Sequence, residues 1–373
     1  MTTLTVKCLS PSVELRLDYY RSKETLSEGV FAYKWSWSNN PEVYQSGDLN
    51  YFHFENLRIL SNGHLQLHCD DIGHPFENSQ LNQDYVLKIY SDKKAEHKLR
   101  TDTDLVIVEE ECIVLAGWSP GEWGHFILDF FPRILMLREI FRDGVDYPIY
   151  VSSLTPDYLV EVICMCLRLK KSIIKTYRDS GYTVFRKAIV PGHAFGAKGG
   201  GFHPEIGRFV RDFTTQIKHN LNFPSTLYSQ KIYVSRKHDS VYKPLNPLRP
   251  VVNEDEVINF VLQRNFTVVR MEDFSFLEKI CLLGNVSLIL GGWGSGLLNS
   301  FLGVSGSRVL SLGLGFNSSQ QRITRLLQQD YHEIPTFDPC SPNVVLNDIR
   351  ARPQKVNLNF LSAFLDKMDG FKS

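Results

Sequence analysis

Apolar and polar positions divide the chain into a β-rich beginning and a longer part in which strand-like and helix-like segments alternate. Through residue 100, short runs of β-favouring residues are separated by Asn, Asp, Ser and Gly. From Leu105 onward, apolar runs of strand length alternate with segments of helical period, which is typical of a layered α/β fold. The pattern therefore predicts a β-rich N-terminal extension, residues 1–100, followed by α/β structure.

The α/β part separates into two halves at a polar, proline-containing linker, Asn222–Ser229. In the first half, residues 101–222, we expect strands at Leu105–Leu115, Tyr147–Val151 and Ala188–Val190 and helices at Phe126–Phe141, Tyr158–Leu169 and Pro204–Leu221. In the second half, residues 229–350, we expect strands at Lys231–Ser235, Phe266–Met271, Val286–Leu290 and Arg308–Leu312 and helices at Val257–Arg264, Phe276–Leu283, Leu297–Leu302 and Gln320–Gln328. Residues 351–373 are expected to form a C-terminal tail or helix.

Two helix starts in the second half carry capping signals. Asn253 precedes one predicted helix, with Glu256 three residues later, and Ser275 with Glu278 repeats the spacing before the next. Such pairs satisfy the first N–H groups of a helix reciprocally. Both pairs are therefore predicted to be capping boxes.

Length and charge limit the function classes. A chain of 373 residues is long enough for two domains. Lys+Arg and Asp+Glu both number 41, and a formal net charge of zero argues against a protein that coats nucleic acid. No apolar run approaches the ~20 residues that span a bilayer, and the start lacks a signal-peptide pattern. We therefore expect a cytoplasmic protein with no nucleic-acid partner and at most peripheral membrane association.

Cysteine and histidine usage predicts no metal site. The seven cysteines are odd in number and form no CxxC pair, which fits a reduced compartment. Cys164 and Cys166 lie in an apolar stretch that is typical of a core. His64 and His68 share one face of a predicted strand, and a solvated face is favoured there over metal binding, because no further ligand has metal-site spacing.

A glycine-dense turn follows the predicted strand Val286–Leu290 and opens the next helix. Residues 291–299 read Gly-Gly-Trp-Gly-Ser-Gly-Leu-Leu-Asn. Glycines let the backbone approach a ligand closely, and N–H groups at a helix start attract anions. The turn therefore favours a phosphate or pyrophosphate ligand, a tight turn without ligand being the alternative. The spacing does not fit GxGxxG, and Trp293 stands where a nucleophile elbow around Ser295 requires glycine.

Two arginines follow the first strand of the second half. Arg236 comes directly after Lys231–Ser235, at the edge where open α/β sheets bind ligands, and Arg249 lies shortly after it. A guanidinium group binds phosphate oxygens through two parallel N–H groups. Both residues are candidates for anion binding, and solvated surface arginines are the alternative. The glycine-rich stretch 196–201 resembles a phosphate loop only loosely and is expected to be a loop near a cleft.

Three ionisable residues share one face of a predicted helix in the first half. His125, Asp129 and Arg133 stand at i, i+4 and i+8 among Phe, Ile and Leu, and Pro132 is expected to kink the helix. A histidine hydrogen-bonded to a carboxylate is a candidate general base. A core histidine satisfied by Asp129 is the alternative interpretation.

Taken in series, five segments resemble the signature elements of glycosyltransferase family 61. They are Gly124–Arg133 (GHxxxDxxPR in the family), Tyr233–Arg236 (YxSR), Arg249–Glu254 (R…NE), Ser275–Lys279 (SFxEQ) and Gly291–Asn299 (GxHGAGLTN). Their order and spacing match from about Gly117 to Leu312, and Met1–Arg100 is not covered.

The resemblance implies a glycosyltransferase of the GT-B type, in which two facing Rossmann-like domains hold the active site between them. It implies an inverting, metal-independent reaction without a cofactor, in which a sugar passes from a nucleotide-sugar, most often a UDP-sugar, to a polysaccharide or glycolipid acceptor. Capsule or surface-polysaccharide synthesis in the bacterial cytoplasm is the expected setting.

The resemblance also suggests roles for single residues. His125, oriented by Asp129, would deprotonate the acceptor hydroxyl, and Arg133 would neutralise Asp129 or touch the acceptor. Residues expected to bind the nucleotide-sugar are Arg236, Arg249 and Lys279 at the diphosphate, Glu272 or Glu278 at the ribose, and Gly292, Trp293, Gly294, Ser295, Gly296 and Asn299 in the turn. Glu278 is equally interpreted as a helix cap.

Four positions depart from the family pattern and keep other functions open. Trp293 stands where the family has His, Ser295 and Leu298 replace Ala and Thr, and Lys279 replaces Gln. An indole can stack on a base or a sugar ring but carries no charge. A non-catalytic nucleotide-sugar-binding scaffold or sensor in a polysaccharide assembly complex is therefore the second hypothesis. A nucleotide-dependent oxidoreductase is disfavoured by the glycine spacing.

Overall fold

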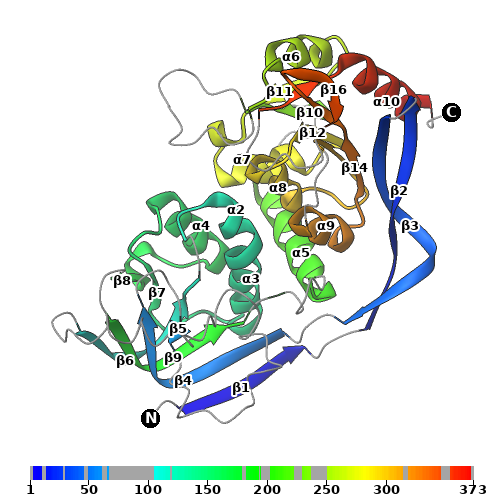
Figure 1. The fold of residues 1–373 in the computed structure, drawn as a ribbon. Coiled ribbons are helices and arrows are strands. Elements are labelled where there is room, and N and C mark those ends of the chain that lie inside the picture. The colour runs from blue at the N-terminus through cyan, green and yellow to red at the C-terminus, as the bar shows by residue number, and fades with distance from the viewer. Residues whose placement is uncertain are drawn as a thin grey trace. The chain divides into compact units, whose positions relative to one another are not determined.

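The chain forms two compact units in a computed structural model (Figure 1). Unit 1 combines Met1–Leu15 with Tyr44–Phe213, and unit 2 combines Arg16–Val43 with Thr214–Ser373. The structure describes residues 3–10, 14–27, 30–45, 49–60, 65–66, 105–117, 120–178, 182–192, 194, 202–221, 229–236, 250–313, 318–345 and 353–370. Within these ranges, no helix combines the length and the apolar character that crossing a bilayer requires.

Unit 1 is built on a seven-stranded sheet with the order β1-β4-β9-β6-β7-β8, in which β5 pairs with β4. The strands are β1 (Thr3–Ser10), β4 (Leu49–Leu60), β5 (Leu65–Gln66), β6 (Leu105–Leu115), β7 (Ile149–Ser152), β8 (Ile174–Tyr177) and β9 (Tyr182–Pro191). β9, β6, β7 and β8 run parallel, which confirms the α/β prediction, whereas β4 and β1 add antiparallel strands beyond β9. Side chains from β4, β6 and β9 form a buried cluster that includes Phe54, Val114 and Phe185.

The helices of unit 1 follow the parallel strands. They are α2 (Trp123–His125), the π-helical segment η4 (Phe126–Phe130), α3 (Phe131–Ile140), α4 (Asp157–Leu167), the 3-10 turn η5 (Lys171–Ile173) and α5 (Pro204–Leu221). The single predicted helix Phe126–Phe141 is thus divided. Pro132 has no N–H group and its ring crowds the carbonyl of the preceding turn, so the helix widens before it. The N–H of Phe131 accordingly bonds to the carbonyl of Phe126, five residues back.

Unit 2 is built on a second seven-stranded sheet with the order β11-β10-β12-β13-β14-β3-β2. Its strands are β2 (Glu14–Ser27), β3 (Val30–Gln45), β10 (Lys231–Val234), β11 (Thr267–Val269), β12 (Leu288–Gly292), β13 (Arg308–Leu312) and β14 (Asp330–Ile334). The strands from β11 to β14 are parallel, and β3 pairs antiparallel with β14. A small antiparallel sheet adds β15 (Thr336–Asp338), β16 (Ser341–Val345) and β17 (Lys355–Val356).

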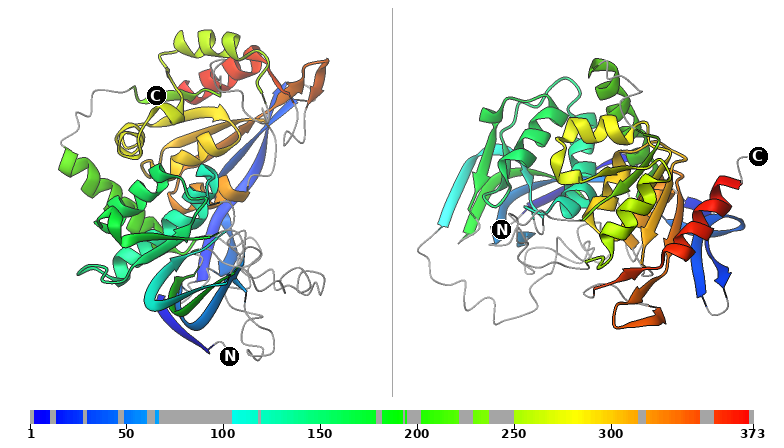
Figure 2. Two further views of the ribbon diagram at one scale, coloured as in Figure 1. Left: turned by 90° about the vertical axis from the view of Figure 1, so that its left-hand side faces the viewer. Right: turned by 90° about the horizontal axis from the view of Figure 1, so that it is seen from above.

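Helices cover both faces of the unit 2 sheet. They are α6 (Glu254–Leu262), the 3-10 turn η6 (Met271–Asp273), α7 (Phe276–Leu283), α8 (Ser295–Leu298), the 3-10 turn η7 (Asn299–Leu302), α9 (Ser318–Leu326) and α10 (Leu358–Gly370). In the right-hand view of Figure 2, α7 and α10 lie on opposite sides of the strands. Two-sided cover explains why these strands read as near-continuous apolar runs.

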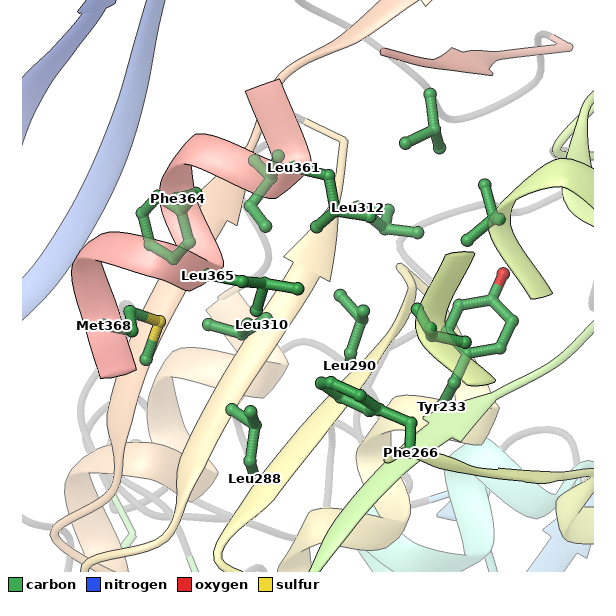
Figure 3. Close-up of a cluster of buried hydrophobic side chains, with 14 of the residues drawn as sticks. Tyr233, Phe266, Leu288, Leu290, Leu310, Leu312, Leu361, Phe364, Leu365 and Met368 are labelled. Carbon is green, nitrogen blue, oxygen red and sulfur yellow. The ribbon is translucent and has the colours of Figure 1, made fainter. Parts of the chain in front are cut away.

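The core under α10 shows how the sequence pattern produces the packing (Figure 3). Leu288 and Leu290 on β12, like Leu310 and Leu312 on β13, alternate with residues of the other face. The α10 side chains at i, i+3, i+4 and i+7 meet them, and these are Leu361, Phe364, Leu365 and Met368. Full burial of such side chains stabilises the fold by about 1.5–3 kcal/mol each.

The observed units differ from the predicted domain boundaries. Strands in residues 1–60 join both sheets instead of forming an extension, because an open sheet edge gains hydrogen bonds from any available strand. Residues 351–373, predicted to be a C-terminal tail or helix, contain the helix α10, which belongs to the core of unit 2. The border between the units falls at Phe213, inside the continuous helix α5, rather than in the predicted linker.

One of the two predicted capping boxes is confirmed. The Ser275 hydroxyl accepts the N–H of Glu278, and the Glu278 carboxylate accepts the N–H of Ser275, at the start of α7. Asn253 does occupy the N-cap position of α6, but the predicted capping box is wrong, because its side chain caps no helix N–H. Its amide instead bonds to both backbone groups of Val356 on β17.

Candidate active site

A buried carboxylate organises the end of β10. Glu254, the first residue of α6, is 8% exposed, and its Oε1 accepts three hydrogen bonds. The donors are the Tyr233 hydroxyl at 3.2 Å, the Ser235 hydroxyl at 2.9 Å and the backbone N–H of Arg236 at 2.8 Å. Burial and the Glu254 carboxylate raise the pKa of Tyr233 well above its usual value, so the phenol remains a donor. The Tyr233–Arg236 segment and Glu254 are therefore one hydrogen-bonded unit.

The Arg236 side chain lies along the glycine-dense turn after β12. Its Nη1 donates to the carbonyl of Trp293 at 3.0 Å. A Cβ on Gly292 would stand 3.2 Å from Arg236 Cδ, and Gly294 has a φ of +149° that side chains rarely adopt. The glycines thus allow the guanidinium to pack against the backbone. Burial lowers the pKa of Arg236, and the carboxylates of Glu254 and Glu272 oppose that effect.

A second basic group stands at the start of α7. Lys279 is 8% exposed, and burial lowers its pKa to about 8, although the Glu272 carboxylate opposes the shift. Glu272 is exposed and acts electrostatically on both Arg236 and Lys279, so the structure places these three predicted residues in one electrostatic group. Glu278 serves as the helix cap, and its bonds to Ser275 lower the pKa of its carboxyl.

The remaining turn residues divide between exposed and structural positions. Ser295 is exposed and Gly296 is half-buried. Asn299 is fully buried, and its amide donates to the carbonyls of Ser295 and Gly296 at 3.2 and 2.9 Å. This differs from the contact with the nucleotide-sugar that we expected for Asn299. Because α8 has only four residues, its dipole contributes little to anion binding. Among the residues that the structure describes at this site, Arg236 and Lys279 supply the positive charge.

In unit 1, His125 and Asp129 come together as the spacing predicts. His125 Nδ1 lies 3.1 Å from Asp129 Oδ2, and the two side chains are 25% and 13% exposed. The hydrogen bond that His125 donates to the Asp129 carboxylate raises the pKa of His125, and burial opposes this shift. His125 Nε2 lies 3.6 Å from the exposed carboxylate of Glu122. A carboxylate at Nδ1 selects the tautomer in which Nε2 carries the lone pair. Asp129 lies in the π-helical segment, a distortion that is frequent at functional sites.

Arg133 is buried in the first turn of α3, which differs from the expected contact with an acceptor. It is 1% exposed, donates from Nε to the carbonyl of Pro191 at 2.9 Å and from Nη1 to the carbonyl of Ala116 at 2.6 Å. These carbonyls lie at the ends of β9 and β6. Burial lowers the pKa of Arg133 to about 10, and the charge of Asp129 opposes that shift. Arg133 therefore holds α3 against the ends of β6 and β9, and its positive charge interacts favourably with the Asp129 carboxylate.

Two buried residues of unit 2 escaped the site prediction. The sequence marked Glu254 only as the last residue of a signature segment. Its burial among three hydrogen-bond donors arises because the start of α6 packs against the end of β10. Gln354 is fully buried, accepts a hydrogen bond from the Thr336 hydroxyl at 2.9 Å, and approaches Gly292, where a Cβ would lie 4.0 Å from its Nε2. No local pattern marks Gln354, because a long-range bridge to Val251 places it there.

Some sequence predictions fall outside the described residues. They concern Arg249, the stretch 196–201, and His64 with His68. Within the described ranges, no group of three or more His, Cys, Asp or Glu side chains is arranged to hold a metal ion.

A comparison with known protein families matches the part of the chain that contains both groups of candidate residues. The family model described as Glycosyltransferase 61 matches residues 123–310, about half of the chain, from α2 through β13. No curated protein sequence matches the chain. The matched range contains His125 and Asp129 as well as Arg236, Glu254, Lys279 and the glycine-dense turn. The chain therefore belongs to the glycosyltransferase 61 family and acts on a donor and an acceptor substrate.

Proposed function

We propose that this protein is an inverting, metal-independent glycosyltransferase that moves a sugar from a nucleotide-sugar, most simply a UDP-sugar, to a polysaccharide or glycolipid acceptor in the cytoplasm. The observation that carries the proposal is Arg236, whose backbone N–H is held by Glu254 and whose guanidinium is held against a glycine turn by the carbonyl of Trp293. Two facing Rossmann-like domains of the GT-B type remain part of this proposal.

Unit 2 is proposed to bind the donor. Arg236 and Lys279 supply the positive charge that a leaving diphosphate requires, at the carboxyl edge of a parallel sheet where such folds bind ligands. Glu272 is exposed beside both cations and suits the ribose hydroxyls. Trp293, Ser295 and Gly296 complete the proposed donor surface, and Trp293 suits stacking on the base or the sugar.

Unit 1 is proposed to activate the acceptor. His125 Nε2 takes the proton of the acceptor hydroxyl, and Asp129 holds the imidazole tautomer and stabilises the imidazolium that forms. The hydroxyl oxygen then bonds to the anomeric carbon as the bond from that carbon to the diphosphate oxygen breaks. The electron pair of the broken bond stays on the diphosphate, where Arg236 and Lys279 offset the charge. Attack opposite the leaving group inverts the anomeric configuration.

The two sites predict opposite kinetic effects. His125→Ala should lower turnover by ~10²–10⁴-fold and leave the affinity for UDP unchanged. Arg236→Ala should weaken UDP binding by about tenfold or more, because it removes a charge-assisted contact. Donor hydrolysis and transfer are measured over a panel of nucleotide-sugars, and UDP affinity by calorimetry. Near-wild-type turnover of His125→Ala with a donor that the wild type uses would refute the base assignment.

Trp293 supports a second candidate function, a non-catalytic nucleotide-sugar-binding scaffold. Its indole replaces the histidine of the family pattern, whereas its carbonyl still accepts the Arg236 hydrogen bond. On this alternative, UDP binds and no donor in the panel is hydrolysed or transferred. Trp293→His then gains donor turnover, because the substitution restores a titratable side chain and leaves the backbone contact in place.

A further inference from the structure

The carboxyl edge of the unit 1 sheet carries an aromatic surface that the proposed catalytic roles do not use. The loop after β6 leads into Trp123, and the loop after β7 leads into Tyr158 at the start of α4. The two rings lie 6.4 Å apart between centroids, with their planes inclined by 35°. Because β6 and β7 are neighbouring parallel strands, their following loops emerge side by side.

Backbone packing holds the two loops together. A Cβ on Gly121 would stand 3.2 Å from the carbonyl of Leu154 and 3.7 Å from the ring of Pro156, so the two loops pass close enough to leave little room for a side chain at this position. On its inner side, Trp123 stacks on the buried Phe126, with ring centroids 5.8 Å apart. Packing on Phe126 therefore fixes the position of the Trp123 ring.

The outer part of this surface is unusually open for large apolar side chains. Tyr158 is 47% exposed and Leu154 is 60% exposed. Two exposed carboxylates neighbour the rings along the chain: the side chain of Glu122, which lies 3.6 Å from His125 Nε2, is 70% exposed, and that of Asp157, which pairs with Lys171 at 3.2 Å, is 86% exposed. Partial burial raises the pKa of the Tyr158 phenol, which stays protonated and able to donate a hydrogen bond.

We propose that Trp123 and Tyr158 form a platform that binds a sugar ring of a glycan acceptor. The identity of the ligand rests on the proposed glycosyl transfer, which requires an acceptor. Ring faces attract the C–H face of a sugar, and the neighbouring hydroxyl and carboxylates match its hydroxyl groups. Anionic lipid is disfavoured at this surface, because Glu122 and Asp157 repel its headgroups.

The platform binds a sugar unit other than the one that reacts. Trp123 and His125 are two residues apart in one helical segment, and side chains at that spacing do not face each other. The helix itself, ~10–12 Å across with its side chains, separates the two faces. The acceptor on this proposal is therefore an oligosaccharide or a longer glycan, because a single sugar cannot contact the platform and His125 at the same time.

Saturation-transfer NMR with a defined panel of disaccharides (lactose, maltose, cellobiose, xylobiose and chitobiose) tests the platform. We expect at least one disaccharide to receive saturation on the C–H protons of one ring face. Tyr158→Ala should weaken its binding about tenfold, whereas Tyr158→Phe should keep most of it, because the ring face remains. Leu262→Ala, an exposed apolar position on α6 of unit 2, serves as the matched control and should change nothing.

The outcomes distinguish a failure of the platform proposal from a failure of the proposed function. Hydrolysis of a nucleotide-sugar by wild type and Tyr158→Ala alike, with no saturation transfer to any disaccharide, overturns the platform and leaves the function standing. Disaccharide binding that Tyr158→Ala does not weaken also overturns the platform. Binding that Tyr158→Ala weakens, with no donor turned over by the wild type, supports the platform and refutes the enzyme.

Discussion

Replacing Glu254 should detach Arg236 from the position in which it can bind a diphosphate. One carboxylate oxygen accepts three hydrogen bonds, from Tyr233, Ser235 and the backbone of Arg236, and the carboxylate is almost fully buried. In Glu254→Ala, two buried hydroxyls and one N–H lose their acceptor. In Glu254→Gln, an oxygen remains in place but the negative charge is lost.

The expected magnitudes follow from the three contacts. A hydrogen bond to a charged group contributes about 1.5–3 kcal/mol, and such bonds to one atom are not additive. Removing a buried charged partner typically costs ~3–5 kcal/mol, which is our expectation for Glu254→Ala. Loss of the charge alone in Glu254→Gln should lower the free energy of unfolding by about 1–2 kcal/mol. Tyr233→Phe, which removes one donor, should cost about 1 kcal/mol.

Urea denaturation and calorimetric titration with UDP measure the two consequences separately. Glu254→Gln should lower both the urea midpoint and the affinity for UDP, the latter by about tenfold, because the backbone N–H of Arg236 loses its charged acceptor. Asp255→Asn is the matched control, since this carboxylate lies in the same turn of α6 but is exposed. Unchanged stability and UDP affinity in Glu254→Gln would refute the assignment of Glu254 as the residue that positions Arg236.

Three further predictions concern titration and backbone strain. The pKa of His125 is raised by Asp129, so turnover should fall as pH drops through a value above 6.5, and Asp129→Asn should shift this limb to lower pH and lower turnover about tenfold in pH–rate profiles. Because the pKa of Lys279 is about 8, UDP affinity should fall about tenfold from about pH 7 to about pH 9, and Lys279→Gln should flatten that dependence in calorimetry. Gly294→Ala should cost ~1–3 kcal/mol in urea denaturation and weaken UDP binding, since its methyl group approaches Arg236 Nη1 to 3.4 Å. Gly306→Ala, also at positive φ but in open space, should lose stability without losing UDP affinity.

Local signals predicted the parts of the fold that local physics determines. The bounds of α5 and α7 match the prediction, because helical period and a capping box act within a few residues. The contact between His125 and Asp129 was accessible for the same reason. Asn253 shows the limit, since its cap-like position is overridden by a strand more than a hundred residues later. Burial of Glu254 and Gln354 likewise depends on long-range pairing that no local pattern encodes.

The chemistry of the proposed donor site was harder to predict than the helices and strands that carry it. The glycine-dense turn suggested that N–H groups at a helix start add to the anion binding of the basic side chains, but α8 is too short for this role. Arg236 packing on the turn explains the glycines instead. Asn299 and Arg133 looked like ligand contacts because they are polar within signature segments, whereas both bond to backbone carbonyls inside the fold.

The assignment of the early strands to both sheets has a consequence for biosynthesis. β3 pairs with β14, and Trp35 lies opposite Tyr331. This pair cannot form until Tyr331 has been synthesised, roughly 300 residues after Trp35. At ~5–20 residues per second, that interval lasts roughly 15–60 s. During this time β3 is an open edge, able to pair with other nascent chains. The chain also passes between its units three times, so neither unit is a continuous product of the ribosome. Assembly of the complete unit 2 sheet must therefore follow the synthesis of nearly the whole chain.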